Sequence, residues 1–238
     1  MSAARRDFLK HAGLGAAALA GLPSALRAAA RTSVATPEFS SVDWQQGVEQ
    51  PQPQAVDTTW TEKLTGKYKA VFDVPEIHGG TGVWRGGLWL NHYRDVLKAQ
   101  PSDLNSVIVI RHAAIPLIMS QAYWETYDVA KANKVVHPMT DKKTQRNPVL
   151  MTPTEDGLTG MLAGLTLDKQ MERGAIVLAC GMAFSSVIRT VGAKDKLSAA
   201  DARTKAMSMV HQGVIMQPNG IFGVTLAQHH GCVFVAAS

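Results

Sequence analysis

The stretch that decides the fold is Ala175-Ile176-Val177-Leu178-Ala179-Cys180-Gly181-Met182. Its first five residues are apolar without interruption, which is typical of a strand that is buried on both faces in a parallel sheet. Similar runs predict four further strands, at residues 70–74, 107–110, 214–216 and 232–235. The sequence therefore predicts a mainly parallel sheet of about five strands.

Segments with helical patterns lie between these strands. In residues 82–98, the side chains of Gly86, Leu90, Tyr93 and Leu97 recur on one face of a helix. Further helices are expected at 117–131, 158–173, 182–191, 198–211 and 219–230. Strands that alternate with helices predict an α/β domain with right-handed crossovers and three layers, α/β/α.

The first thirty residues have the pattern of an export signal. Arg5 and Arg6 open the motif Arg-Arg-Asp-Phe-Leu-Lys, the apolar run 12–22 follows, and 28–30 is an Ala-Ala-Ala cleavage site. The motif matches the bacterial twin-arginine signal, which predicts export to the periplasm with cleavage after Ala30, or after Ala35 as a second site. The alternative interpretation of this segment is a basic amphipathic helix.

The rest of the chain divides into a tether and a domain. Residues 31–66 contain Glu-Gln-Pro-Gln-Pro-Gln and no apolar periodicity, so an extended N-terminal tether is expected, with Trp44 and Trp60 as its contacts to the domain. Residues 67–238 are the α/β domain. Its segment 135–157 is a long insert loop that carries Lys142, Lys143 and Arg146, and loops of this length often act as lids or contact surfaces.

Charge and composition exclude several classes of protein. The chain of 238 residues has 24 Lys and Arg and 19 Asp and Glu, a net charge of +5. Residues 1–30 hold four of the basic residues and one of the acidic ones, so residues 31–238 carry only +2. This near neutrality, and the lack of a recognition motif, argue against nucleic acid as a partner. No apolar run reaches about 20 residues, so no transmembrane helix is expected.

The candidate site lies where the strands end, because ligands of open parallel sheets bind beyond the carboxyl ends of the strands. Cys180 ends one strand immediately before a helix, and the N-terminus of a helix favours a reactive thiolate. His112 and His78 follow two other strands and are candidates for tuning that thiol or acting as its base. Gly181, Met182 and Asn219 at the same edge are candidates for substrate binding. The alternative for Cys180 is a buried, structural cysteine.

Other chemistries find little support in the sequence. His229 and His230 lack metal-ligand spacing from other residues, so we expect no metal, and we expect no other cofactor. The glycines at 79–82 do not form a complete dinucleotide-binding motif. Cys180 ends a strand and Cys232 begins one, so parallel strands place them at opposite edges of the sheet, and no disulfide between them is expected.

The order of these motifs resembles the DsrE/DsrF-like family of small α/β proteins linked to sulfur handling. The resemblance covers about residues 67–238 and is carried by the His-containing turn after 107–110, by Ala179-Cys180-Gly181, and by the final helix and strand, Leu226 to Val233. It implies a parallel sheet between helix layers, homo-oligomers and, in some members, a cysteine that carries persulfide sulfur. Cys180 matches the position of that cysteine.

Two functions follow as hypotheses. The first is an exported, DsrE-like sulfur carrier or sulfurtransferase-like protein that works through Cys180. The second is a non-catalytic oligomeric binding or redox-sensing module in which Cys180 is structural. Both include self-association and a small sulfur-containing or anionic ligand, and neither includes stable insertion into a membrane after cleavage.

Overall fold

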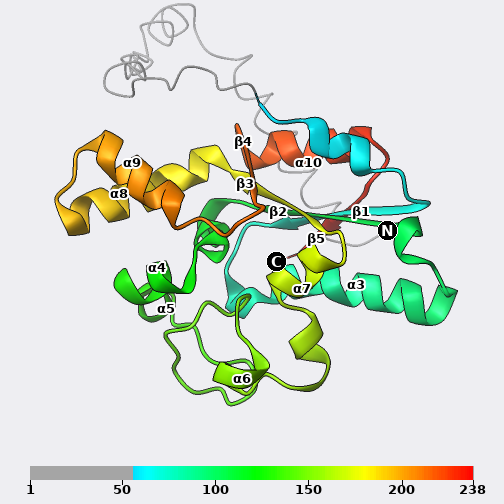
Figure 1. The fold of residues 1–238 in the computed structure, drawn as a ribbon, viewed down its shortest axis with the longest axis horizontal. Coiled ribbons are helices and arrows are strands. Elements are labelled where there is room, and N and C mark those ends of the chain that lie inside the picture. Colours follow the sequence, from blue (N-terminus) through cyan, green and yellow to red (C-terminus); the bar gives the residue numbers. More distant parts are fainter. Residues whose placement is uncertain (1–55, 238) are drawn as a thin grey trace, which may run out of the picture. The chain divides into compact units, whose positions relative to one another are not determined.

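The structure is a computed structural model that describes residues 56–237 and contains a five-stranded parallel sheet. The strand order is β4-β3-β2-β1-β5, and every neighbouring pair is parallel (Figure 1). This confirms the predicted α/β fold class, with each strand within three residues of its expected limits. The strands are β1 (Tyr68–Val74), β2 (Leu104–Ile110), β3 (Ile176–Cys180), β4 (Ile215–Gln217) and β5 (Val233–Ala236).

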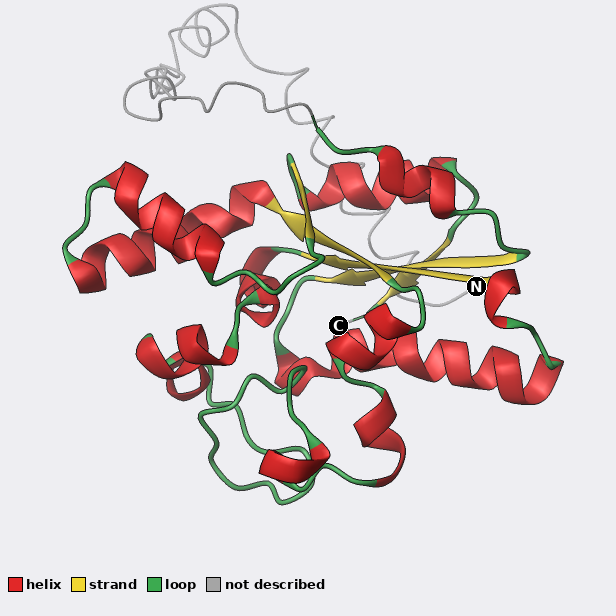
Figure 2. Ribbon diagram, in the orientation of Figure 1, coloured by secondary structure: helices red, strands yellow, loops and turns green. Residues whose placement is uncertain are grey.

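Helices cover both faces of the sheet, as Figure 2 shows. One face packs against α3 (Thr81–Leu97), α7 (Leu167–Glu172) and α8 (Gly181–Asp195), and the other against α10 (Gly220–His229) and the 3-10 helix η1 (Thr59–Lys63). No helix within residues 56–237 has the length and apolar character that a membrane span requires. The shorter helices are η2 (His78–Gly80), η3 (Pro101–Asp103), η4 (His112–Ile118), α4 (Gln121–Thr126), α5 (Val129–Ala132), α6 (Pro153–Asp156), η5 (Gly160–Gly164) and α9 (Ala199–Ser208).

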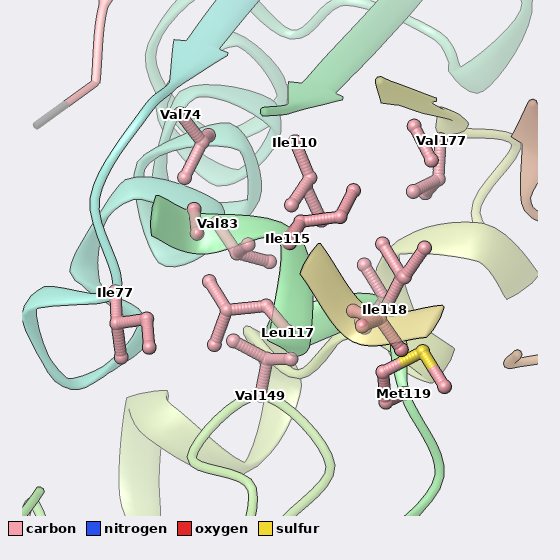
Figure 3. Packing of buried hydrophobic residues seen from close by; sticks show 14 of the residues in the cluster. Val74, Ile77, Val83, Ile110, Ile115, Leu117, Ile118, Met119, Val149 and Val177 are labelled. Atoms are coloured by element: carbon pink, nitrogen blue, oxygen red, sulfur yellow. The ribbon is translucent and has the colours of Figure 1, made fainter. Parts of the chain in front are cut away.

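The central strands alternate their side chains between two apolar clusters, as the pleat requires. In β2, Ile108 and Ile110 face α3 and α8, whereas Val107 and Val109 face α10, and all four are fully buried. Figure 3 shows the larger cluster, in which η4 and Val149 of the insert pack below the ends of the strands. Burial on both faces explains why these strands are apolar without interruption.

Two predicted helices are shorter than expected for local reasons. The segment 117–131 is divided into η4, α4 and α5, because Ser120 caps a new helix through Tyr123 N and Asp128 has a left-handed backbone with φ of 53°. The segment 158–173 contains η5 and then α7, which begins only at Leu167. The other predicted helices match α3, α8, α9 and α10 within a few residues.

The end of the expected tether belongs to the folded body. Trp60 lies in η1, is fully buried, and packs with Val224 and Ala227 of α10. Residues 59–63 are therefore a packed 3-10 helix, not extended chain, because the indole of Trp60 has a large apolar surface to bury. The predicted signal peptide 1–30, both predicted cleavage sites, Trp44 and the Pro-containing 49–54 lie outside the described residues.

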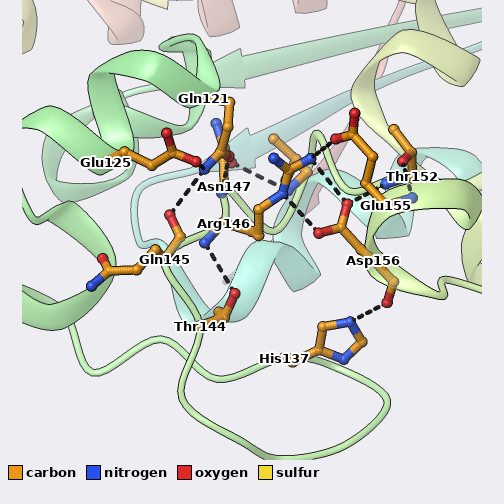
Figure 4. Close-up of polar contacts among 11 residues, drawn as sticks. Gln121, Glu125, His137, Thr144, Gln145, Arg146, Asn147, Thr152, Glu155 and Asp156 are labelled. Atoms are coloured by element: carbon orange, nitrogen blue, oxygen red, sulfur yellow. Dashed lines mark hydrogen bonds and ion pairs between the residues drawn. The ribbon is translucent and has the colours of Figure 1, made fainter.

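The insert loop 135–157 is held to the body by a buried polar network (Figure 4). The fully buried Asn147 donates from Nδ2 to the carbonyls of Leu117 and Met119 and accepts from Val149 N. Arg146 contacts Glu155 at 2.7 Å and Asp156 at 2.7 Å. The hydrogen bonds of Asn147 satisfy buried backbone groups that have no partner in a sheet or a long helix. The insert therefore has a defined conformation.

Candidate functional site

Cys180 lies at the carboxyl end of β3 and is the N-cap residue of α8. Its Sγ accepts a hydrogen bond from Ala183 N at 3.4 Å, and its exposed fraction is 7%. The sulfur therefore faces the unpaired backbone N–H groups of a 15-residue helix, a position that stabilises negative charge on sulfur. The sequence placed Cys180 at a strand end before a helix, and the structure confirms this position.

Arg111 stands beside Cys180 on the neighbouring strand. Ile110 pairs with Ala179 in the β2–β3 ladder, so Arg111 and Cys180 are the next positions along the two strands. Asp73 of β1 accepts two hydrogen bonds from Arg111, Nε to Oδ1 at 2.6 Å and Nη2 to Oδ2 at 2.7 Å. This two-pronged contact fixes the plane of the guanidinium group.

The start of α10 fixes the same arginine from the other side. Gly220 is the first residue of α10, and a Cβ atom added to it would lie 2.6 Å from Arg111 Cβ and 2.7 Å from Arg111 Cδ. Only glycine leaves room for the arginine stem at this contact. The aliphatic part of Arg111 is thus packed against α10 while its charged end is bound to Asp73.

Arg111 places a positive charge at this edge, with the carboxylates of Asp73 and Glu76 near it. The hydrogen bonds that Arg111 donates to Asp73 raise the pKa of Arg111 most, burial opposes this, and interactions with Cys180 and Glu76 raise it further. The guanidinium side chain is 30% exposed, against 12% for the Asp73 side chain. Its Nη1 has no hydrogen-bond partner within residues 56–237, so two N–H donors remain for a ligand.

The two candidate histidines are exposed and do not contact Cys180. The His112 side chain is 70% exposed, and its Nδ1 lies 3.4 Å from Glu76 Oε1. His78 is exposed in η2, and no hydrogen bond or ion pair of the described chain joins either ring to the thiol. Both residues have a left-handed backbone, with φ of 33° at His78 and 50° at His112. Such strained positions are concentrated in functional loops.

The other predicted residues lie around the same strand ends in different surroundings. Gly181 sits against the backbone of β4, and an added Cβ would be 2.8 Å from Gln217 O. Met182 has an exposed side chain, at 71%, and its N–H donates to Pro218 O at 3.3 Å. Asn219 caps α10, with Oδ1 accepting from Phe222 N at 2.8 Å. Met182 is therefore the one of these three with a large surface free for a ligand.

A cleft of about 470 Å³ lies elsewhere, between α7, the insert and the segment before β4. Its polar lining includes Thr152, Thr166 and the pair His211–Asp168, whose Nε2 and Oδ1 atoms are 2.6 Å apart. None of the residues predicted from the sequence lines it. The cleft is large enough for a small molecule, but it is separate from the thiol.

Cys232, just before β5, is the second cysteine of the described chain, and both thiols are free and buried. Burial raises the pKa of Cys232 to about 11, although Lys69 opposes this. A thiol with such a pKa is almost entirely protonated near neutral pH and is a poor nucleophile. Within residues 56–237, no group of three or more His, Cys, Asp or Glu side chains is arranged to hold a metal ion.

The pair Asp73–Arg111 is the part of the site that sequence reasoning missed. A signal for it exists, because Asp73 is the one charged residue in the apolar run Ala70–Val74 and Arg111 directly follows the next buried strand. Opposite charges near the same end of neighbouring parallel strands predict an ion pair. Comparisons of the chain with family models, curated proteins and solved structures found no match.

Proposed function

We propose that this chain is a DsrE-like protein that carries or transfers sulfur through Cys180. The observation that supports this most is the position of the thiol, which caps α8 and lies beside the Arg111–Asp73 pair. A thiolate is the species that accepts sulfane sulfur, and both the helix N-terminus and the guanidinium group favour it.

The proposed reaction needs no external oxidant or reductant. The Cys180 thiolate attacks the outer sulfur of thiosulfate, a new S–S bond forms to Cys180, and the S–S bond of thiosulfate breaks. Sulfite leaves with the electron pair of the broken bond, and Cys180 keeps a persulfide. A second thiolate on an acceptor then takes the terminal sulfur and regenerates the Cys180 thiolate.

Arg111 supplies the specificity for an anionic donor in this proposal. Asp73 binds Nε and Nη2, so the unpaired Nη1 is the atom that meets the oxygens of thiosulfate or the developing sulfite. Charged hydrogen bonds of this kind are about twice as strong as neutral ones. His112 and His78, exposed at the same edge, are the candidates for moving a proton to or from an acceptor.

Mass spectrometry of the folded protein after incubation with thiosulfate or polysulfide tests this function. We expect an added sulfur atom on the peptide that contains Cys180. Cys232→Ser is the matched control, because Cys232 is equally buried and should leave the labelling unchanged. No adduct at Cys180, or equal labelling of the Cys180→Ser variant, would falsify the proposal.

The second candidate is a non-catalytic binding or redox-sensing module with a structural Cys180. Two observations favour it: Cys180 is buried, with 7% of the residue exposed, and the cleft near His211 offers a separate place for a ligand. Alkylation separates the candidates. A carrier thiol reacts much faster in the folded protein than the Cys232 thiol does, whereas a structural Cys180 reacts only at the rate of unfolding.

Export and self-association belong to the same proposal. The twin-arginine motif supports a periplasmic location, and an Arg5→Lys, Arg6→Lys variant should then remain in the cytoplasm at full length. Self-association is supported by β5, an edge strand whose Val233 and Phe234 are 68% and 44% exposed. Sedimentation analysis should show an oligomer that Phe234→Lys weakens, and a monomeric wild-type protein would contradict this.

A further inference from the structure

Four exposed lysines gather on one short segment, residues 131–143, which we name the lysine loop. Lys131 lies in the last turn of α5, Lys134 has a left-handed backbone, and Lys142 and Lys143 follow the turn of the loop. Within residues 56–237, none of the four has an ion-pair or hydrogen-bond partner for its ammonium group, unlike Lys169, Lys194 and Lys205. These charges are therefore available to a partner.

The loop accounts for most of the net positive charge of the described chain. Residues 56–237 contain 19 Lys and Arg and 15 Asp and Glu, a net charge of +4. Residues 131–143 contain four lysines and one acid, Asp141, and so account for +3 of this total. The remainder of the described surface is nearly neutral, so the electrostatic attraction of an anionic partner is concentrated at this loop.

Two apolar side chains stand exposed among the lysines. Val136 is 41% exposed and Met139 is 45% exposed. Figure 1 shows the segment between α5 and α6 on the side of the body away from α10. A loop with exposed apolar side chains among exposed lysines has the composition of a surface that enters a lipid headgroup layer.

The loop has a fixed shape before any partner binds. Val136 and Lys143 form an antiparallel bridge, and His137 N donates to Lys142 O at 2.8 Å. The His137 ring contacts Asp156 O at 2.8 Å, which ties the loop to the network around Arg146 (Figure 4). The loop therefore loses little conformational entropy on binding, so even weak electrostatic attraction can give measurable affinity for a partner.

We propose that the lysine loop docks the protein on an anionic lipid surface. The lysines face the headgroups, and Met139 and Val136 enter the boundary between headgroups and acyl chains. An acidic protein would satisfy the lysines equally well. The exposed apolar side chains of Val136 and Met139 favour a lipid layer, because a lipid layer offers them an apolar environment without a matching rigid pocket.

The test uses the full chain in a Cys180→Ser, Cys232→Ser background, which removes both native thiols, with a polarity-sensitive dye on a Met139→Cys substitution. Vesicles of phosphatidylcholine mixed with phosphatidylglycerol should shift the emission to the blue and protect the dye from an aqueous quencher, and vesicles of phosphatidylcholine alone should do neither. A dye on Met207→Cys, a similarly exposed methionine in α9, should stay in water. Because the dye reports the position of residue 139, binding through any other segment gives no signal.

Charge variants test the role of the lysines. In low salt, Lys142→Gln with Lys143→Gln should weaken vesicle binding by about 25-fold, at about fivefold for each lysine. The matched control, Lys63→Gln with Lys196→Gln, removes the same charge from exposed positions elsewhere and should have little effect. An unshifted dye at position 139, or an equal loss in both double variants, overturns the proposal. Retention of the wild type on polyglutamate but not on anionic vesicles assigns the loop to an acidic protein instead.

Discussion

The ion pair between Asp73 and Arg111 supports the sharpest prediction about the stability of the candidate site. The Asp73 side chain is 12% exposed, whereas the Arg111 side chain is 30% exposed. Replacing Arg111 by Met keeps the packing on Gly220 but leaves a buried carboxylate without a counter-charge. Breaking a fully buried pair costs about 3–5 kcal/mol, and the partial exposure of this one lowers the expected loss to about 3 kcal/mol.

The reverse substitution should cost less. In Asp73→Asn the arginine keeps a hydrogen-bond acceptor and can turn its exposed end into water, so we expect a loss of about 1.5 kcal/mol. The double variant removes both charges and leaves neither one buried alone. Its loss should therefore be smaller than the sum of the two single losses by about 2 kcal/mol.

Urea denaturation followed by tryptophan fluorescence measures all four proteins, with the slope m compared to confirm that the unfolded state is unchanged. The control is Arg94→Met, which removes an arginine from the exposed pair with Asp95 and should not change the free energy of unfolding measurably. Equal losses for Arg111→Met and Asp73→Asn, or strictly additive losses in the double variant, would refute this account of the pair.

Three further predictions concern the rest of the fold. Burial raises the pKa of Cys232 to about 11 in the folded protein, so the thiol ionises at lower pH in the unfolded chain. The free energy of unfolding should therefore fall by roughly 2 kcal/mol as the pH rises from about 9 to 11, and this loss should be absent in Cys232→Ala. Asn147→Leu leaves two buried carbonyls without a donor and should cost about 3 kcal/mol, with faster proteolysis within 135–157. Gly220→Ala should cost about 1–3 kcal/mol in denaturation, because its Cβ meets Arg111, whereas Gly164→Ala meets nothing and should be nearly neutral.

The sheet was predictable from the sequence because strands that are buried on both faces have uninterrupted apolar runs. Residues 107–110 of β2 and 176–179 of β3 are all apolar and alternate between two clusters, as strands buried on both faces require. Helix boundaries were harder where single residues interrupt the pattern. Asp128 adopts a left-handed backbone conformation that the sequence around it does not predict. This conformation interrupts the helix that apolar periodicity alone would extend to residue 131.

The candidate site was predictable in position but not in its contacts. Cys180 follows from the strand end, since the carboxyl edge of a parallel sheet is set by topology. Whether a histidine reaches that thiol depends on loop conformation, and the left-handed backbone at His112 places its ring near Glu76. Asp73 and Arg111 are 38 residues apart, and only the β1–β2 pairing brings them together.

The strand order explains why the thiol is covered although it lies at the point where ligands of such sheets usually bind. The helix after β3, α8, packs on one face of the sheet, and the helix after β4, α10, packs on the other. In open parallel sheets the ligand-binding crevice forms between such strands, so here it is expected between the carboxyl ends of β3 and β4. The backbone closes that gap, because Gly181 has no room for a Cβ beside Gln217 O and Met182 N donates to Pro218 O. In the proposed reaction, a donor would therefore reach Cys180 from the β2 side, where Arg111 offers its unpaired Nη1. On that path the proposed mechanism has Arg111 recognise the charge of the donor before Cys180 attacks its sulfur.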